Sequence, residues 1–176
     1  MSENNWKKLD EHYAYRGWRS ILVKRFELPN GEPASFDIVE SPSFVTIIPI
    51  TKAGRWVCIR QYRPGPEKFI TGFPEGGVEE AESVKDTALR ELKEETGYTA
   101  EQLIYLKARR NAYFTQTQYF VLALGCEKVK EQTLDDSEFI EVLELEQKKL
   151  LEMLRSPEDE FNNIAAAYLA LDYQSK

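Results

Sequence analysis

The sequence predicts an α/β fold, and two kinds of pattern support this prediction. Several segments rich in β-branched and aromatic residues have the composition of strands, while others repeat their apolar residues every three or four positions, as amphipathic helices do. The chain has 176 residues, of which 42% are hydrophobic. A single domain of this size can bury a substantial core.

Four strands are expected outside the N-terminal region. They cover residues 44–50, 55–62, 119–124 and 139–143. The first two are separated by Lys52-Ala53-Gly54, which has the composition of a hairpin turn. The strand at 119–124 is apolar throughout, so it should be buried. Residues 71–77 are rich in Gly, Pro and Thr and are expected to form a loop in which Gly76 and Gly77 let the backbone approach a ligand.

One helix is expected over residues 84–96. Ser83 with Asp86 has the spacing of an N-terminal cap, and Gly97 suits the position after the last turn, where φ is positive. The apolar stripe that should face the core consists of Val84, Ala88, Leu89 and Leu92. Two further helices are expected over residues 147–155 and 162–173, which show the same apolar spacing.

A second face of the 84–96 helix is acidic. Glu91 lies three and four residues before Glu94 and Glu95, and Arg90 can reach Glu94 at the i+4 spacing. Like charges repel at these spacings, and the helix macrodipole disfavours anions at the C-terminal end by roughly 0.3–1 kcal/mol each. A cation should offset this repulsion. For an isolated pattern of this kind, a solvated acidic surface would be the commoner explanation.

The composition favours a hard cation with oxygen ligands, such as Mg²⁺. The chain contains one histidine, His12, and two cysteines, Cys58 and Cys126, which argues against a zinc site rich in nitrogen and sulfur. Both cysteines lie in apolar segments and are expected to be buried free thiols. Main-chain carbonyls of the 71–77 loop are further candidate ligands.

Charge and hydropathy limit the classes of partner. The net charge of −7 argues against broad nucleic-acid binding, and no apolar run reaches the roughly 20 residues of a membrane span. The N-terminus is polar and unlike a signal peptide, so a cytoplasmic location is expected. The basic candidates nearest to the expected site are Arg60, Arg63, Arg109 and Arg110, although surface positions are the simpler explanation for the last two.

Residues 76–98 fit the pattern G-x5-E-x7-R-E-U-x-E-E-x-G-U, in which U is apolar. The matching positions are Gly76, Glu82, Arg90, Glu91, Glu94, Glu95 and Gly97, and a chance match at a given start is below about one in 10⁸. The last position holds Tyr98 where an aliphatic residue is more usual. On this pattern the chain resembles the Nudix hydrolases.

The resemblance extends over the chain from about Trp18 and is greatest to the branch that hydrolyses ADP-ribose and nucleoside diphosphate sugars. Gln61-Tyr62-Arg63-Pro64-Gly65 and Glu138-Phe139-Ile140-Glu141-Val142 are similar to segments of that branch. It implies an α/β/α sandwich around a mixed sheet, preceded by N-terminal antiparallel strands, here 20–26 and 34–39. It also implies that residues 1–43 are an extension through which a homodimer forms, and that residues 44–176 are the hydrolase domain.

The resemblance also assigns site residues. The metal ligands would be Glu91, Glu94, Glu95 and the main-chain carbonyl of Glu75, with Glu82 and Arg90 holding them in place. Glu82 would belong to the metal site. Arg90 would belong to the catalytic residues as a side chain that forms ion pairs. Glu138 would supply a further carboxylate, either to a metal or as the general base. Glu94 and Glu95 are the alternatives for the base, and Asp135 and Asp136 lie close by in the sequence. Arg63 would contact a substrate phosphate, and Trp18 would stack on a base or pack in an interface.

The implied reaction is metal-dependent hydrolysis of a diphosphate linkage, with Mg²⁺ or Mn²⁺, in ADP-ribose or a sugar nucleotide. Two departures leave the substrate open. Gly72-Phe73-Pro74-Glu75-Gly76 lacks the acidic residue that many ADP-ribose hydrolases have two places before the proline, and residues 110–118 replace their usual Pro-Gly segment. Alternatives are hydrolysis of dinucleoside polyphosphates or nucleoside triphosphates, or a non-catalytic sensor of nucleotide sugars.

Overall fold

The structure is a computed structural model that describes residues 5–158 and 161–176. The described residues form two compact units. The first comprises residues up to 43 together with 109–117, and the second comprises residues 44–108 and those from 118 onward. The inclusion of 109–117 in the first unit could not be anticipated from the sequence, because it depends on contacts such as the hydrogen bond from Val39 N to the Tyr113 carbonyl, 2.9 Å.

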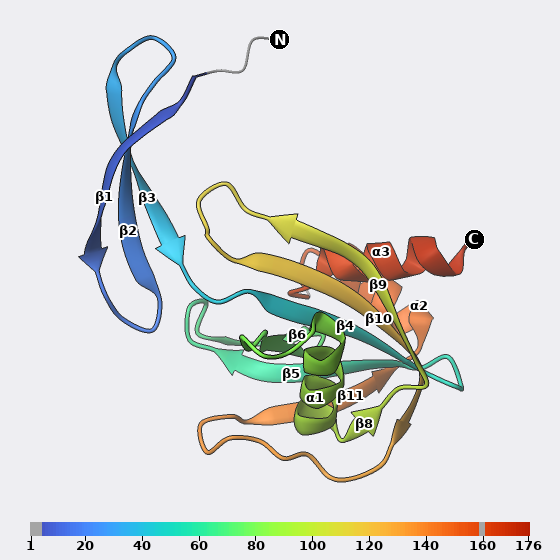
Figure 1. Cartoon of the computed structure of the whole chain (residues 1–176). Helices are drawn as coiled ribbons and strands as arrows, with labels where there is room; N and C mark the ends of the chain where they lie inside the picture. Colours follow the sequence, from blue (N-terminus) through green and yellow to red (C-terminus); the bar gives the residue numbers. More distant parts are fainter. Residues whose placement is uncertain (1–4, 159–160) are drawn as a thin grey trace. The chain divides into compact units, whose positions relative to one another are not determined.

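The first unit contains an antiparallel three-stranded sheet in the order β1-β2-β3 (Figure 1). Its strands are β1 (Lys7–Tyr15), β2 (Ser20–Glu27) and β3 (Pro33–Glu40). Strands β2 and β3 match the expected N-terminal strands, and Gly31, with a φ of 86°, closes the turn between them. Strand β1 was not expected from the sequence. Every residue in it is exposed, so it lacks the apolar pattern that marks a buried strand.

The second unit is built on a mixed sheet whose main path runs β11-β5-β4-β10-β8, with β6, β7 and β9 paired to β5, β4 and β10. Strand β10 pairs with β4 in parallel, whereas β5 is antiparallel to both β4 and β11. The strands are β4 (Phe44–Thr51), β5 (Trp56–Arg63), β6 (Lys68–Gly72), β7 (Glu75–Gly77), β8 (Tyr98–Thr99), β9 (Gln102–Arg110), β10 (Thr117–Lys128) and β11 (Ile140–Leu145).

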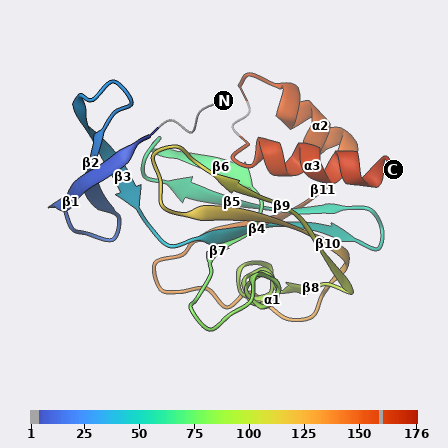
Figure 2. The same ribbon diagram turned by 45° about the horizontal axis from the view of Figure 1, so that its top comes forward.

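Helices cover both faces of this sheet. Helix α1 (Val84–Thr96) lies on one face, and α2 (Gln147–Arg155) and α3 (Ile164–Gln174) lie on the other (Figure 2). Alternate residues of the central strands enter two separate cores. On β4, Val45 and Ile47 face the α1 side, while Ile48 and Ile50 face α2 and α3. The predicted α/β/α sandwich is therefore confirmed.

Several predicted details of the elements were wrong. Residues 71–77, expected to be a loop, contain the end of β6 and all of β7. Helix α3 begins at Ile164, two residues later than expected, and β11 begins at Ile140. Leu89 is 36% exposed and lies outside the core, to which α1 contributes the buried Ala88 and Leu92, with the partly buried Val84 packed against them.

The predicted ends of α1 were correct. The Ser83 side chain accepts a hydrogen bond from Asp86 N at 3.2 Å, and Gly97 has a φ of 77° with its N–H bonded to the Lys93 carbonyl. Cys58 and Cys126 are both free and buried, as expected. Among the described helices, none has the length and hydropathy needed to cross a membrane.

Candidate active site

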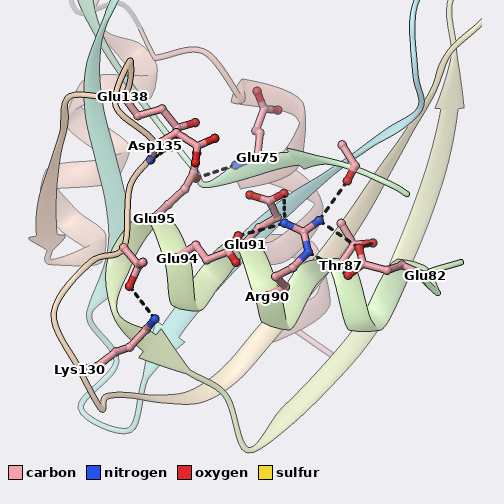
Figure 3. A network of polar contacts seen from close by, with 12 residues as sticks. Glu75, Glu82, Thr87, Arg90, Glu91, Glu94, Glu95, Lys130, Asp135 and Glu138 are labelled. Carbon is pink, nitrogen blue, oxygen red and sulfur yellow. Dashed lines mark hydrogen bonds and ion pairs between the residues drawn. The ribbon is translucent and has the colours of Figure 1, made fainter. Parts of the chain in front are cut away.

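Three segments of the second unit bring the acidic side chains together. Helix α1 contributes Glu91, Glu94 and Glu95, the short strand β7 contributes Glu75, and the connection between β10 and β11 contributes Glu138 (Figure 3). Strand β7 is placed by antiparallel pairing with β4. The fold therefore brings together acids as far apart in the sequence as Glu75 and Glu138, which are more than 60 residues from each other.

Arg90 is bonded to three of the carboxylates. Its Nε lies 2.8 Å from Glu82 Oε1 and its Nη2 3.0 Å from Glu82 Oε2, while Nη1 lies 2.7 Å from Glu91 Oε1 and 3.0 Å from Glu94 Oε2. Thr87 Oγ1 adds a hydrogen bond to Glu82 at 2.9 Å. The Arg90 bond lowers the pKa of Glu82. Arg90 thus partly offsets the acidic charge that the sequence indicates.

Glu95 is the most deeply buried of the acids, with 5% of its surface exposed. Its Oε2 accepts a hydrogen bond from Glu75 N at 3.1 Å. Burial raises the pKa of Glu95 well above its ordinary value, and the nearby carboxylates of Glu91, Glu138 and Glu75 raise it further. Burial likewise raises the pKa of Glu91, despite its bond to Arg90.

The close approach of β7 to α1 explains why the first position of the pattern is a glycine. A Cβ atom at Gly76 would lie 1.8 Å from Glu91 Cδ and 2.0 Å from Glu91 Oε1. Any side chain at position 76 would therefore displace the Glu91 carboxylate. At Gly77, by contrast, a Cβ would meet no atom within 4 Å.

The side chain of Glu75 is directed towards two neutral donors. Its Oε1 accepts from Thr46 Oγ1 at 2.5 Å and from Asn163 Nδ2 at 2.8 Å. Burial raises the pKa of Glu75, while these bonds and the charge of Arg63 act in the opposite direction. Thr46 and Asn163 were not among the predicted site residues, because nothing in a single sequence links them to residue 75.

The segment that carries Glu138 is attached to the C-terminal end of α1. Thr133 N donates to the Glu94 carbonyl at 2.9 Å, and Gln132 Nε2 donates to the carbonyls of Glu95, at 2.5 Å, and Ile140, at 3.1 Å. Gln132 was also missed at the sequence level. Glu138 N donates to the Asp135 carbonyl at 2.9 Å, which closes a turn next to the acidic cluster.

The remaining sequence candidates belong to other segments of the chain. Trp18 belongs to the first unit, where it is 88% exposed, and Arg109 and Arg110 belong to that unit as well. Arg60 forms an exposed ion pair with Glu141 at 3.3 Å and lies over the ring of Phe69. The positive charge of Arg63 acts on Glu75, an acid of the site.

The donor atoms of the site suit a hard divalent cation, since they are carboxylate and carbonyl oxygens. Among residues 5–158 and 161–176, no three His, Cys, Asp or Glu side chains form a preassembled metal-binding group. Oxygens of Glu91 and Glu94 are bonded to Arg90 instead. Burial raises the pKa values of Glu91 and Glu95, so a cation beside these carboxylates would stabilise their charged forms.

Several known proteins are similar to this chain over most of its length. Residues 41–163 match the family described as NUDIX domain. The "ADP-ribose pyrophosphatase" of Bacillus subtilis (strain 168) is 34% identical over 156 residues, which cover 86% of this chain and 84% of that protein. The "Methanol dehydrogenase activator" of Bacillus methanolicus is 36% identical with the same coverage. A solved structure, "Crystal structure of ADP compounds hydrolase", aligns with 99% of this chain and 97% of its own chain, with a TM-score of 0.87 at 26% identity.

Proposed function

Because this chain belongs to the Nudix hydrolase family, we propose that it hydrolyses the diphosphate linkage of a nucleoside diphosphate joined to a second group. The products are a nucleoside monophosphate and the phosphorylated second group. ADP-ribose is the first candidate substrate, and a sugar nucleotide is the second. The observation that carries this proposal is the convergence of Glu91, Glu94 and Glu95 on Arg90 and the Glu75 strand.

In this proposal the carboxylates of Glu91, Glu94 and Glu95 hold a divalent cation, together with the main-chain carbonyl of Glu75. Mg²⁺ is the expected ion and Mn²⁺ its substitute. When bound, the cation supplies positive charge to the diphosphate and lowers the pKa of a bound water. Glu82 belongs to the same group of residues, and its bonds to Arg90 and Thr87 hold the arginine in place.

Glu138 is the proposed general base. It accepts a proton from the attacking water as the water oxygen bonds to one phosphorus and the bond from that phosphorus to the bridging oxygen breaks. The support for this role is its place beside Glu91 and Glu95, whose pKa values it helps to raise, on a segment attached to α1. Glu94 and Glu95 are the alternatives for the same step.

Two side chains are proposed to bind the substrate. Arg63 would contact a phosphate, since its positive charge acts on the same region as Glu75. Trp18 would stack on the base in a homodimer formed through residues 1–43, since its ring is exposed and available for contact. Both assignments rest on the family resemblance and on these placements.

A second candidate function is the activation of a partner enzyme. The relative from Bacillus methanolicus, named as an activator of methanol dehydrogenase, is as similar to this chain as the named pyrophosphatase is. A sensor of this kind would bind a nucleotide sugar without hydrolysing it. The filled acidic positions of α1 favour hydrolysis, because clustered carboxylates without a cation destabilise the fold.

The experiment is a competition among substrates. The protein is incubated with Mg²⁺ and an equimolar pool of ADP-ribose, ADP-glucose, GDP-mannose, NADH, a diadenosine polyphosphate and nucleoside triphosphates, and each species is followed by mass spectrometry. Loss of ADP-ribose with formation of AMP and ribose phosphate supports the first candidate. Selective loss of a sugar nucleotide moves the assignment to that substrate, and an unchanged pool with Mg²⁺ or Mn²⁺ overturns the hydrolase proposal.

A further inference from the structure

The segment just before α3 is bonded to the strand that precedes the acidic site. Asn162 N donates to the Thr71 carbonyl at 2.9 Å, and Phe161 forms a parallel bridge with Thr71. The next residue, Asn163, is 5% exposed. Its Oδ1 accepts from Phe73 N at 2.7 Å, and its Nδ2 donates to Glu75 Oε1 at 2.8 Å. One amide therefore bonds to both sides of Pro74.

Two further features indicate that this contact is built into the fold. A Cβ atom at Gly72 would lie 2.5 Å from Asn163 Oδ1, so the glycine leaves room for the amide. Asn163 is also the N-cap residue of α3, yet its side chain forms no capping bond. Asparagine at this position ordinarily bonds to the free N–H groups of the helix. Here the amide is used to hold residues 73–75 instead.

A hydrogen bond links Glu75 to Glu95. The backbone N–H of Glu75 donates to Glu95 Oε2 at 3.1 Å, while the Glu75 carboxylate is held on the other side by Asn163 and Thr46. Gln118 Nε2 donates in turn to Thr46 Oγ1 at 3.0 Å. The orientation of the buried Glu95 carboxylate therefore depends on the position of Glu75, and that position depends on Asn163.

We propose that Asn163 is a positioning residue for the acidic site. Its amide fixes residues 73–75 so that the Glu75 N–H holds the Glu95 carboxylate in the orientation that binds a divalent cation, and it keeps the Glu75 side chain turned away from that carboxylate. The inference rests on the proposed function of the site. Groups that orient metal ligands typically change metal affinity or activity by about 10–100-fold when they are replaced.

The test reverses the polarity of one hydrogen bond. In Asn163→Asp the acceptor for Phe73 N is kept, but the donor to Glu75 is lost and two carboxylates face each other. In the double variant Asn163→Asp with Glu75→Gln, the amide at position 75 can donate to the carboxylate at 163, and the Thr46 hydroxyl can accept as well as donate. Asn162→Asp is the matched control, since it makes the same change at an exposed neighbouring side chain.

Mn²⁺ affinity is measured by calorimetry without substrate, and thermal unfolding is measured in the absence of metal. We expect Asn163→Asp to weaken Mn²⁺ binding by about 10–100-fold, and both the double variant and Asn162→Asp to bind within about threefold of the wild type. Wild-type affinity in Asn163→Asp overturns the inference. A folded double variant that binds Mn²⁺ weakly also overturns the inference. This result overturns it even if Asn163→Asp does not fold.

The same measurements separate this inference from the proposed function. A wild-type protein that binds Mn²⁺ but hydrolyses no member of the substrate pool removes the hydrolase proposal, and weak binding by Asn163→Asp then still supports the positioning role. Hydrolysis by the wild type together with full Mn²⁺ affinity in Asn163→Asp overturns the positioning role alone.

Discussion

The guanidinium group of Arg90 meets the carboxylate of Glu82 with two parallel hydrogen bonds, 2.8 Å from Nε to Oε1 and 3.0 Å from Nη2 to Oε2. This pairing fixes the plane of the guanidinium, so that Nη1 faces Glu91 and Glu94. Glu82 precedes α1, and the pair therefore also joins the turn after β7 to the helix.

Replacing Arg90 by lysine should disturb the site although the charge is kept. An ammonium group cannot form the paired bonds to Glu82 and still reach Glu91 and Glu94. We expect turnover of the substrate to fall by about tenfold or more, because groups that orient metal ligands have effects of this size. Steady-state kinetics would measure it, with Arg155→Lys on the exposed surface of α2 as the control. An equal loss of turnover in Arg90→Lys and Arg155→Lys would contradict the role given to Arg90.

The two glycines of β7 offer a matched pair of substitutions. Gly76→Ala would place a methyl group 1.8 Å from Glu91 Cδ, so the flexible Glu91 side chain must move, whereas Gly77→Ala meets no atom within 4 Å. We expect Gly76→Ala to lower Mn²⁺ affinity by about tenfold or more and Gly77→Ala to leave it nearly unchanged. Calorimetry on both variants tests this, and similar affinities for the two would show that the position of Glu91 does not matter for binding.

Stability of the metal-free protein should depend on pH through Glu95. Its pKa is raised by burial and by neighbouring carboxylates, so the folded protein keeps a proton that the unfolded chain has already released. The resulting stabilisation is complete below the ordinary pKa and is lost as pH rises through the raised value. As pH rises above the ordinary carboxyl range, the free energy of unfolding should therefore fall more steeply in the wild type than in Glu95→Gln. Urea denaturation with a chelator measures both curves, and parallel curves would refute the prediction.

Glu138→Gln tests the proposed base. Loss of a general base commonly lowers a rate by about 10²–10⁴-fold, and we expect kcat to fall within that range while Mn²⁺ affinity stays close to that of the wild type. Asp136→Asn, two residues earlier, should have little effect on kcat. If Asp136→Asn were the slower variant, the base would have to be assigned to a different acid of the same segment.

Much of the second unit could be predicted from sequence because its central strands are buried on both faces. Residues of β4 and β10 enter both cores, and this burial produces the continuous apolar runs that marked them as strands. The ends of α1 were equally clear, because Ser83 and Gly97 each have a local conformational role. Strand β1 carries no such signal, since all of its residues are exposed.

Glu91, Glu94 and Glu95 were visible in the sequence because their spacing on one helix is local, whereas Glu75 and Glu138 were assigned through the family resemblance. Glu82 and Arg90 were assigned in the same way, but the two side chains that hold Glu75 were not predicted. Thr46 and Asn163 lie 29 and 88 residues from Glu75, and their hydrogen bonds exist only once β4, β7 and the segment before α3 are assembled. Their residue types are common, so a single sequence does not distinguish them from other polar residues.

The most direct test of the account is Mg²⁺-dependent hydrolysis by Glu95→Gln. The amide keeps the size of the side chain and an oxygen that can accept from Glu75 N, so the metal-free variant should fold at least as stably as the wild type. Loss of the negative charge of a proposed ligand should nevertheless reduce turnover, at saturating substrate and wild-type Mg²⁺ levels, by more than the roughly 10–100-fold typical of groups that only orient metal ligands. A folded Glu95→Gln variant with undiminished Mg²⁺-dependent turnover would contradict the assignment of the active site to this cluster.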